Sequence, residues 1–142
     1  MERYIGFEVH TLHNLIGRAI LLCLDKAPED VTTMHGWMIE YLFNRQDEDV
    51  YQRDLEEHFS MRRSTVSRML QLMERNGLVA RASVGSDARL KKITLTPKAI
   101  AAHERILKGR EKVEQQMNKG ISEQELQTFF QVLDKIKANL QP

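Results

Sequence analysis

The segment 61–77 carries side chains of the kinds that bind nucleic acid on one side of a predicted helix. Its apolar residues recur at i, i+3, i+4 and i+7, which gathers them on one helix face. They are Val66, Met69, Leu70 and Met73. The opposite face carries the polar residues Ser64, Arg68, Gln71 and Arg75. Hydroxyl, guanidinium and amide groups contact phosphates and read base edges. The spacing therefore predicts a DNA recognition helix.

The positive charge of the chain is concentrated around this helix. Residues 61–92 hold eight basic and two acidic side chains, a net charge of +6. The rest of the chain holds 13 basic and 18 acidic side chains, a net charge of −5. Such segregation is typical of a surface that binds a polyanion on an otherwise neutral body. A solvated helix face that is basic without any partner is the alternative interpretation.

The elements that must position this helix are predicted on both sides of it. Residues 51–59 form a short helix in which Leu55 and Phe59 face inward, and Ser60-Met61 connects it tightly to the next. Two short helices joined in this way make a helix-turn-helix. Arg62 then lies at the N-terminus of the second helix, where a cation opposes the helix dipole by roughly 0.3–1 kcal/mol. A phosphate partner explains this arginine better than folding does.

A basic hairpin is predicted directly after the recognition helix. Asn76-Gly77 is a sequence that ends a helix. Residues 78–84 and 90–96 then form two strands, joined by a turn at 85–88. Such a hairpin is a wing, and we expect its tip over the DNA backbone or in the minor groove.

The candidate DNA contacts come from the start of the recognition helix and from the wing. At the wing tip, Arg89 is expected to enter the groove, and Asp87 can hold its guanidinium by a bidentate pair. The full set is Arg62, Arg63, Ser64, Thr65, Ser67, Arg68, Gln71, Arg81, Ser86, Asp87, Arg89 and Lys91.

Amphipathic helices are predicted before and after this region. Helix starts are expected at Thr32 or Thr33, at Thr96-Pro97 and at the capping box that begins with Ser122. The predicted fold is mainly α with a small β-wing, in a single chain spanning residues 1–142. A winged helix-turn-helix at 32–96 is flanked by helices at 1–25 and 97–142.

These flanking helices predict a homodimer. A monomer has little on which to bury the apolar stripes of residues 4–24 and 122–140. Packing them against the same helices of a second copy buries both, and two-fold dimers are the commonest such arrangement.

The chain as a whole is expected to be one cytoplasmic domain. Its 142 residues fit one domain, and 42% hydrophobic content argues against disorder. Cys23 is the single cysteine, which excludes an internal disulfide and fits a reducing compartment. Neither a signal peptide nor a membrane-spanning run is expected.

The order of elements and several motifs resemble the MarR family of bacterial transcription regulators. Residues 63–68, Arg-Ser-Thr-Val-Ser-Arg, look like that family's recognition-helix opening, and residues 74–79 like its exit. Asp87-Ala88-Arg89 followed by Leu95-Thr96 matches the wing signature. The resemblance covers essentially the whole chain. It implies a triangular homodimer that binds pseudo-palindromic double-stranded DNA and releases it when a small aromatic or phenolic compound binds.

Two positions depart from the family pattern. An acidic residue is frequent in the family where Arg62 stands, so base contacts at that end of the helix are expected to differ. The usual glycine after the wing signature is Ala99, which should affect only the start of the following helix.

The resemblance also suggests a place for an effector. His13, Trp37, Tyr41 and His103 come from the three helices that line the family's ligand pocket. They combine aromatic surface with polar tips, although each residue alone is more often part of a core. No cofactor or metal is expected, because the metal-sensing pattern is not matched. Cys23 is expected in the core rather than at the position of the family's redox-active cysteine.

Other functional classes remain as alternatives. A winged helix can bind protein instead of DNA, and a metal- or redox-responsive regulator of the same fold is a further alternative. An enzyme is not expected and no catalytic residue is assigned. No nucleophile–base arrangement, phosphate loop or paired acid and base is recognisable in the sequence.

Overall fold

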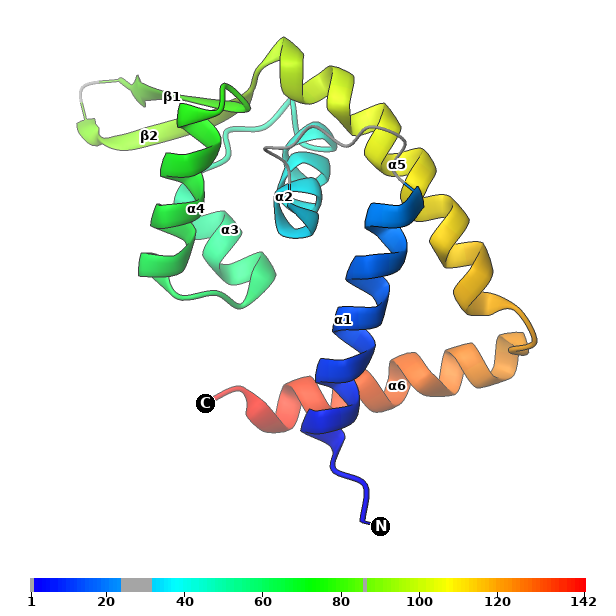
Figure 1. The fold of residues 1–142 in the computed structure, drawn as a ribbon. Helices are drawn as coiled ribbons and strands as arrows, with labels where there is room; N and C mark the ends of the chain where they lie inside the picture. Colours follow the sequence, from blue (N-terminus) through cyan, green and yellow to red (C-terminus); the bar gives the residue numbers. More distant parts are fainter. Residues whose placement is uncertain (1, 24–31, 86) are drawn as a thin grey trace.

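The computed structural model describes residues 2–23, 32–85 and 87–142, with the backbone alone at 87–89. Within these residues the chain is mainly helical with one two-stranded antiparallel sheet, which confirms the predicted fold class (Figure 1). The elements in chain order are α1 (Ile5–Cys23), α2 (Thr33–Phe43), α3 (Gln52–Phe59), α4 (Arg63–Arg75), β1 (Val79–Val84), β2 (Asp87–Leu95), α5 (Pro97–Asn118) and α6 (Glu123–Leu140).

The helix starts follow the capping signals in the sequence. Thr32, Thr96 and Ser122 are the N-cap residues of α2, α5 and α6, and each side chain accepts a backbone hydrogen bond from the first turn. At α6, Glu125 completes the predicted capping box by accepting from the Ser122 backbone N–H at 2.8 Å. This carboxylate also accepts from the Ser122 hydroxyl, and these hydrogen bonds lower the pKa of Glu125. The predicted starts are therefore confirmed.

The wing differs from the prediction at its turn. β2 begins at Asp87, so the turn predicted at 85–88 is wrong in its second half, because residues 87 and 88 belong to the strand. Backbone pairing extends the ladder to Val84 and Asp87, after an irregularity between Ser83 and Val84. The extra residues lie in β2 as a bulge, a feature that increases local twist and that turn propensities do not reveal.

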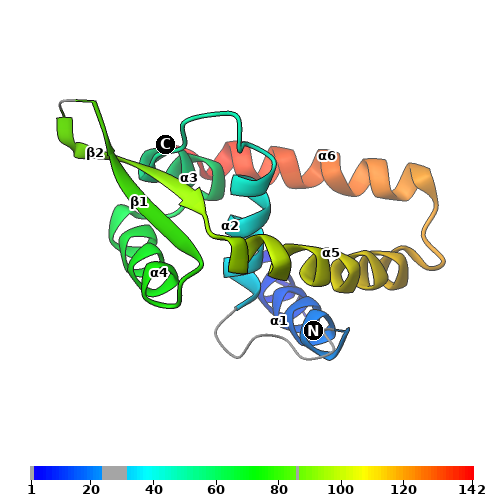
Figure 2. The same ribbon diagram turned by 90° about the horizontal axis from the view of Figure 1, so that it is seen from above.

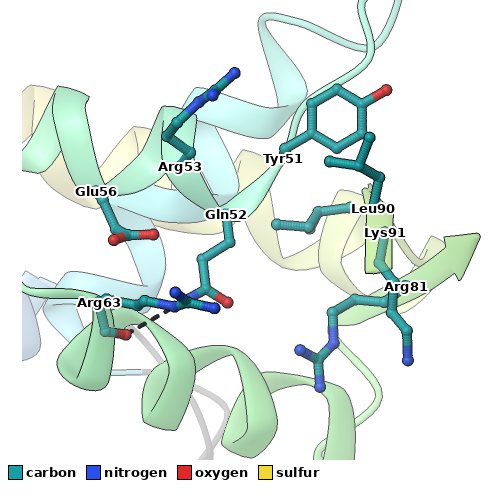
Figure 3. A pocket seen from close by; sticks show the side chains of 9 residues that line it. Tyr51, Gln52, Arg53, Glu56, Arg63, Arg81, Leu90 and Lys91 are labelled. Atoms are coloured by element: carbon teal, nitrogen blue, oxygen red, sulfur yellow. Dashed lines mark hydrogen bonds between the residues drawn. The ribbon is translucent and has the colours of Figure 1, made fainter. Parts of the chain in front are cut away.

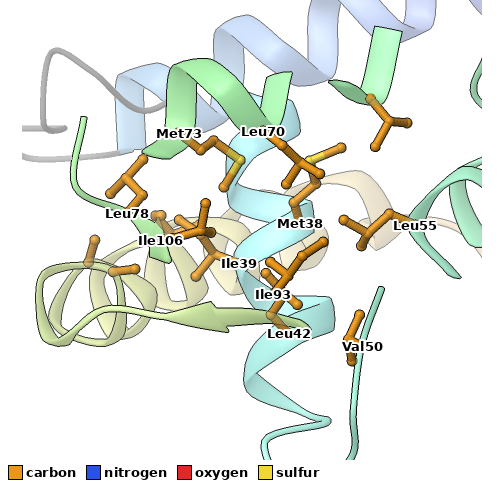
Figure 4. Close-up of a cluster of buried hydrophobic side chains, with 14 residues drawn as sticks. Met38, Ile39, Leu42, Val50, Leu55, Leu70, Met73, Leu78, Ile93 and Ile106 are labelled. Atoms are coloured by element: carbon orange, nitrogen blue, oxygen red, sulfur yellow. The ribbon is translucent and has the colours of Figure 1, made fainter. Parts of the chain in front are cut away.

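The core of the winged region lies between α2, α4 and α5 (Figure 4). The apolar face predicted for α4 is its buried face: Val66, Leu70 and Met73 are fully buried, and Met69 packs partly against them. Burying a side chain of this size contributes about 1.5–3 kcal/mol. The remaining buried members are Met38, Ile39, Leu42, Val50, Leu55, Leu78, Val79, Ile93, Ala99, Ala102 and Ile106.

The terminal helices are arranged around α5. α1 and α6 cross in Figure 1, but the view from above places them on opposite sides of α5 (Figure 2). No residue of α6, all of which the structure describes, is buried in the single chain. Apolar side chains of α1 and α5, including Leu15, Ile16, Val113 and Met117, line an open groove between these two helices. Among the described residues no helix has both the length and the apolar character that crossing a bilayer requires.

The packing of α4 gives a test of the fold. We expect Leu70→Ala to lower the free energy of unfolding by about 2–5 kcal/mol, because it leaves a cavity in a fully buried site. Leu72→Ala is the matched control, since Leu72 is on the same helix but 42% exposed. Its effect should be about 0.5 kcal/mol or less. Urea unfolding at one protein concentration measures both, and equal losses would contradict the assignment of the two faces.

Candidate nucleic-acid interface

The exposed face of α4 carries most of the predicted DNA contacts, and we call it the recognition face. Its members are Arg62, Arg63, Ser64, Thr65, Ser67, Arg68 and Gln71. All are exposed except Ser67, which is half-buried. Because the opposite face is fixed in the core, these side chains are held toward solvent by the helix itself. The structure therefore brings this part of the predicted set together on one surface.

The turn before α4 sets how the two helices of the motif meet. Ser60 ends α3 in the left-handed conformation, with φ at 51°, and the Met61 N–H donates to the Glu56 carbonyl at 3.0 Å. Such a residue reverses the chain within a short connection. The tight connection predicted at Ser60-Met61 is thus present, and it places the N-terminus of α4 against α3.

The N-terminus of α4 is suited to an anion. Arg62 is the N-cap residue, and its guanidinium has no acceptor with which to cap the first turn. The Arg62 carbonyl accepts from the Thr65 and Val66 N–H groups at 3.0 and 3.1 Å. The first-turn backbone donors that precede Thr65 have no partner inside a helix, and the helix dipole favours negative charge there. A phosphate would satisfy these donors and the Arg62 cation together.

A basic cleft runs between α3, the start of α4 and the wing (Figure 3). It has a volume of about 620 Å³. The lining residues are Tyr51, Gln52, Arg53, Glu56, Arg63, Arg81, Leu90, Lys91 and Ile93. Gln52 Nε2 donates to the Arg63 carbonyl at 3.3 Å and so joins the first turns of the two helices. Four cations and one carboxylate line the cleft, so its potential favours a polyanion.

Sequence reasoning missed the part of the cleft that comes from α3. Arg53 stands among Asp54, Glu56 and Glu57, so a count of charge along the chain does not single it out. Gln52 and Tyr51 carry no charge signal at all. Only the packing of α3 beside the wing brings Arg53 into the lining of the cleft with Arg63.

The wing is anchored to the rest of the domain by ion pairs. Arg81 Nε donates to Glu74 Oε2 at 2.5 Å, and this pair joins β1 to the last turn of α4. Lys92 Nζ lies 2.9 Å from Asp49 Oδ1. The Arg81 side chain is 23% exposed. Its Nε atom is bound to Glu74, and the residue also lines the basic cleft. Its contact with DNA stays a prediction.

The remaining predicted wing contacts are placed only in part. Lys91 is exposed on β2 and lines the basic cleft. Ser86 lies outside the described residues, and so do the side chains of Asp87 and Arg89. The expected bidentate pair at the wing tip therefore stays a prediction.

The four predicted ligand residues make separate local contacts. Trp37 lies under the Arg110 guanidinium, whose carbon is 3.9 Å from the ring centroid. Tyr41 contacts His58, with ring centroids 4.5 Å apart. His103 stacks on Phe43 at 4.0 Å and is buried, while His13 is exposed on α1. Their joint role in a pocket stays a prediction.

The alternatives based on metal or redox chemistry concern other residues. In the parts of the chain that the structure describes, no group of three or more His, Cys, Asp or Glu side chains is placed to hold a metal ion. Cys23 is a free thiol and is half-buried at the end of α1, where a fully buried position was expected.

The recognition helix, the helix before it and the two-stranded hairpin after it define a winged helix-turn-helix protein. The model of the MarR family matches residues 29–90. Solved structures of transcription regulators match nearly the whole chain. The chain is thus similar to the MarR family of winged-helix transcription regulators, by the family model over residues 29–90 and by solved structures over nearly the whole chain.

Three solved structures illustrate the similarity. The S. aureus MepR–DNA complex is 25% identical, with a TM-score of 0.86 over 99% of this chain and 100% of that chain. The transcription regulator MarR from Oenococcus oeni PSU-1 is 29% identical, with a TM-score of 0.77 over 95% of this chain and 99% of that chain. The heme sensor protein PefR from Streptococcus agalactiae, in complex with heme, is 23% identical, with a TM-score of 0.67 over 99% and 95%. The last likeness shows the fold alone.

The buried His103 gives a prediction about pH. Burial lowers the pKa of His103, and the nearby Glu104 carboxylate opposes this only in part. The unfolded chain, with a histidine pKa of about 6.5, then takes up the proton more readily than the folded chain. His103 therefore costs stability as the pH falls below about 6.5.

We expect this cost to appear in a comparison with His103→Gln, which does not titrate. Chemical unfolding at pH 8 and at pH 5.5 measures the difference in unfolding free energy between the two proteins. The difference should move in favour of the glutamine variant at the lower pH. A move in favour of the histidine would show that its pKa is raised in the folded protein.

Proposed function

We propose that the protein is a homodimeric repressor that binds a pseudo-palindromic operator and leaves it when a small ligand binds. The observation that carries the DNA-binding part is the joint placement of the recognition face and the basic cleft. Side chains that read bases lie on α4, and cations that neutralise phosphates lie between α3 and the wing. The S. aureus MepR structure, which is a DNA complex, has the same fold over the whole chain.

The homodimer follows from the apolar surface that the single chain leaves open. In α6 the side chains of Phe129 and Phe130 are 46% and 53% exposed, and the groove between α1 and α5 is lined by apolar residues. Exposed apolar surface of this extent is typical of an interface. A second copy related by a two-fold axis can bury both the exposed side chains of α6 and the groove between α1 and α5. Two recognition faces related by a two-fold axis would match an inverted repeat.

The proposed effector site lies between the winged region and the terminal helices. His13, Trp37, Tyr41 and His103 lie on α1, α2 and α5, where the winged region joins the terminal helices. A small aromatic or phenolic compound that binds there would act on the angle between these parts. PefR, a protein of the same fold, is a heme sensor protein.

The DNA-binding proposal is tested with Arg68→Ala. We expect this variant to bind a selected operator about 1–3 kcal/mol more weakly and to lose preference for it over random duplex, because a base contact is removed. Filter binding at matched salt measures both affinities. Arg105→Ala is the matched control, since Arg105 is an exposed arginine on α5 that belongs neither to the recognition face nor to the lining of the basic cleft.

Arg53→Ala separates phosphate contacts from base contacts. It should weaken operator and random duplex equally and should reduce the slope of log K against log salt by about 1. Unaltered protein that shows no decline of affinity with salt would overturn DNA binding. Such a result would favour the alternative of a protein-binding module.

The dimer is tested on α6. Phe130→Glu places a charge in the proposed interface, and we expect it to shift sedimentation from dimer toward monomer at micromolar concentration. Gln131→Glu is the matched control, because it makes the same change of charge at the next residue, outside the apolar stripe. If both variants sediment as the unaltered protein does, α6 is not part of the interface.

A further inference from the structure

Helix α5 belongs to two parts of the molecule. Ala99, Ala102 and Ile106 in its first half are buried in the core of the winged region. Val113 in its second half lines the groove with α1. The helix has 22 residues and is about 33 Å long. Its central residues therefore lie where the DNA-binding region meets the helices proposed to form the dimer.

Two apolar contacts dock α2 on this central part of α5. At Gly36 the helices approach closely, since a Cβ there would lie 3.1 Å from Ile106 Cγ2. Two turns further along α2 and about one turn back along α5, Phe43 stacks on His103 with 4.0 Å between ring centroids and 16° between planes. Both contacts hold the helices together by packing, which restricts the angle between them less strictly than a directional hydrogen bond does.

A third contact is directional, and we call it the clamp: Trp37, Glu40 and Arg110. The guanidinium of Arg110 lies 3.9 Å above the Trp37 ring, and Arg110 Nη1 donates to Glu40 Oε2. The Arg110 and Glu40 side chains are 12% and 27% exposed. A planar cation held between a ring and a carboxylate restricts both the distance and the angle between two helices.

The clamp is not the arrangement that would give the greatest stability. Among the described residues no acceptor lies within hydrogen-bond distance of Arg110 Nη2, which is buried. Burial also lowers the pKa of Arg110. Removing two charges from water costs free energy that an incompletely satisfied pair does not recover, and apolar residues of the same volume are often equally stable or more so. A partly buried pair of this kind is better explained by the geometry that it specifies.

We propose that Arg110 is a positioning residue that, through Trp37 and Glu40, fixes the angle of the winged region on α5 and so sets the spacing of the operator half-sites. This inference rests on the proposed homodimer that binds DNA. As plane geometry, a tilt of about 10° displaces a point about 20 Å from the pivot by about 3.5 Å, which is about one base-pair step. A small loss of angular restraint is therefore enough to change which spacings a dimer accepts.

The test uses the full chain and the duplex that the unaltered protein selects from a random DNA pool. Two further duplexes carry one base pair added or removed at the centre, which rotates the half-sites by about 35° relative to each other. The unaltered protein should bind these two at least about 10-fold more weakly. Glu40→Leu/Arg110→Met, which fills the same space without charge, should bind all three within about 3-fold while its thermal unfolding is unchanged or shifted upward.

A second variant and a control distinguish a loss of angular restraint from a general loss of folding. Arg110→Lys keeps a charge beside Glu40 and removes the planar group over Trp37, so it should also lose discrimination between spacings. Arg105→Met makes the same kind of change at an exposed position of α5 and should keep the discrimination of the unaltered protein.

The outcomes are distinguishable. Folded Arg110 variants that weaken binding to all three duplexes equally would overturn this inference, because a merely structural role changes affinity and not spacing. Unaltered protein that binds none of the duplexes would overturn the proposed function and this inference together.

Discussion

The arrangement of the protein depends on the burial of one face of α4. Val66, Leu70 and Met73 are fully buried between α2 and α5, and a helix cannot turn one face inward without turning the opposite face outward. The polar side chains of α4 are thus presented to solvent by apolar packing behind them. No hydrogen bond of their own is needed for this orientation. Substitutions in the core would therefore alter the presentation of Arg68 without touching the surface.

Contacts outside α4 fix the orientation of its exposed polar face. The left-handed residue Ser60 sets the angle between α3 and α4, and the Glu74–Arg81 pair fixes the base of the wing beside α4. The buried contacts of α2 with α5 then join this unit to the terminal helices. α4 presents the recognition face, and the contacts with α5 hold the winged region on the terminal helices. The DNA-binding geometry of a dimer would therefore depend on both α4 and α5.

Much of this could be predicted from the sequence, because the signals concerned are local. Capping residues such as Thr96 and Ser122 act within one turn, and the apolar spacing of α4 needs only its own residues. The contacts that the sequence did not predict are those between separate elements of the structure. Glu74 becomes the partner of Arg81 only through the packing of α4 on β1, and Arg53 reaches the cleft only because α3 lies beside the wing. The bulge in β2 shortened a turn that residue preferences placed over 85–88.

The same distinction holds for the proposed effector residues. His103 was assigned to a ligand pocket by resemblance, and that role stays a prediction. The structure adds that it is stacked on Phe43 with its Nε2 atom buried and, among the described residues, without a hydrogen-bond partner. Ring contacts between helices cannot be derived from spacing within one helix.

The most direct test of the central claim is selection of bound sequences from a random duplex DNA pool with the full-length protein. A homodimer that presents two copies of α4 should enrich an inverted repeat whose half-site centres are about 10–10.5 base pairs apart, one turn of DNA. Enrichment of no sequence, or of a single unrepeated half-site, would contradict the account.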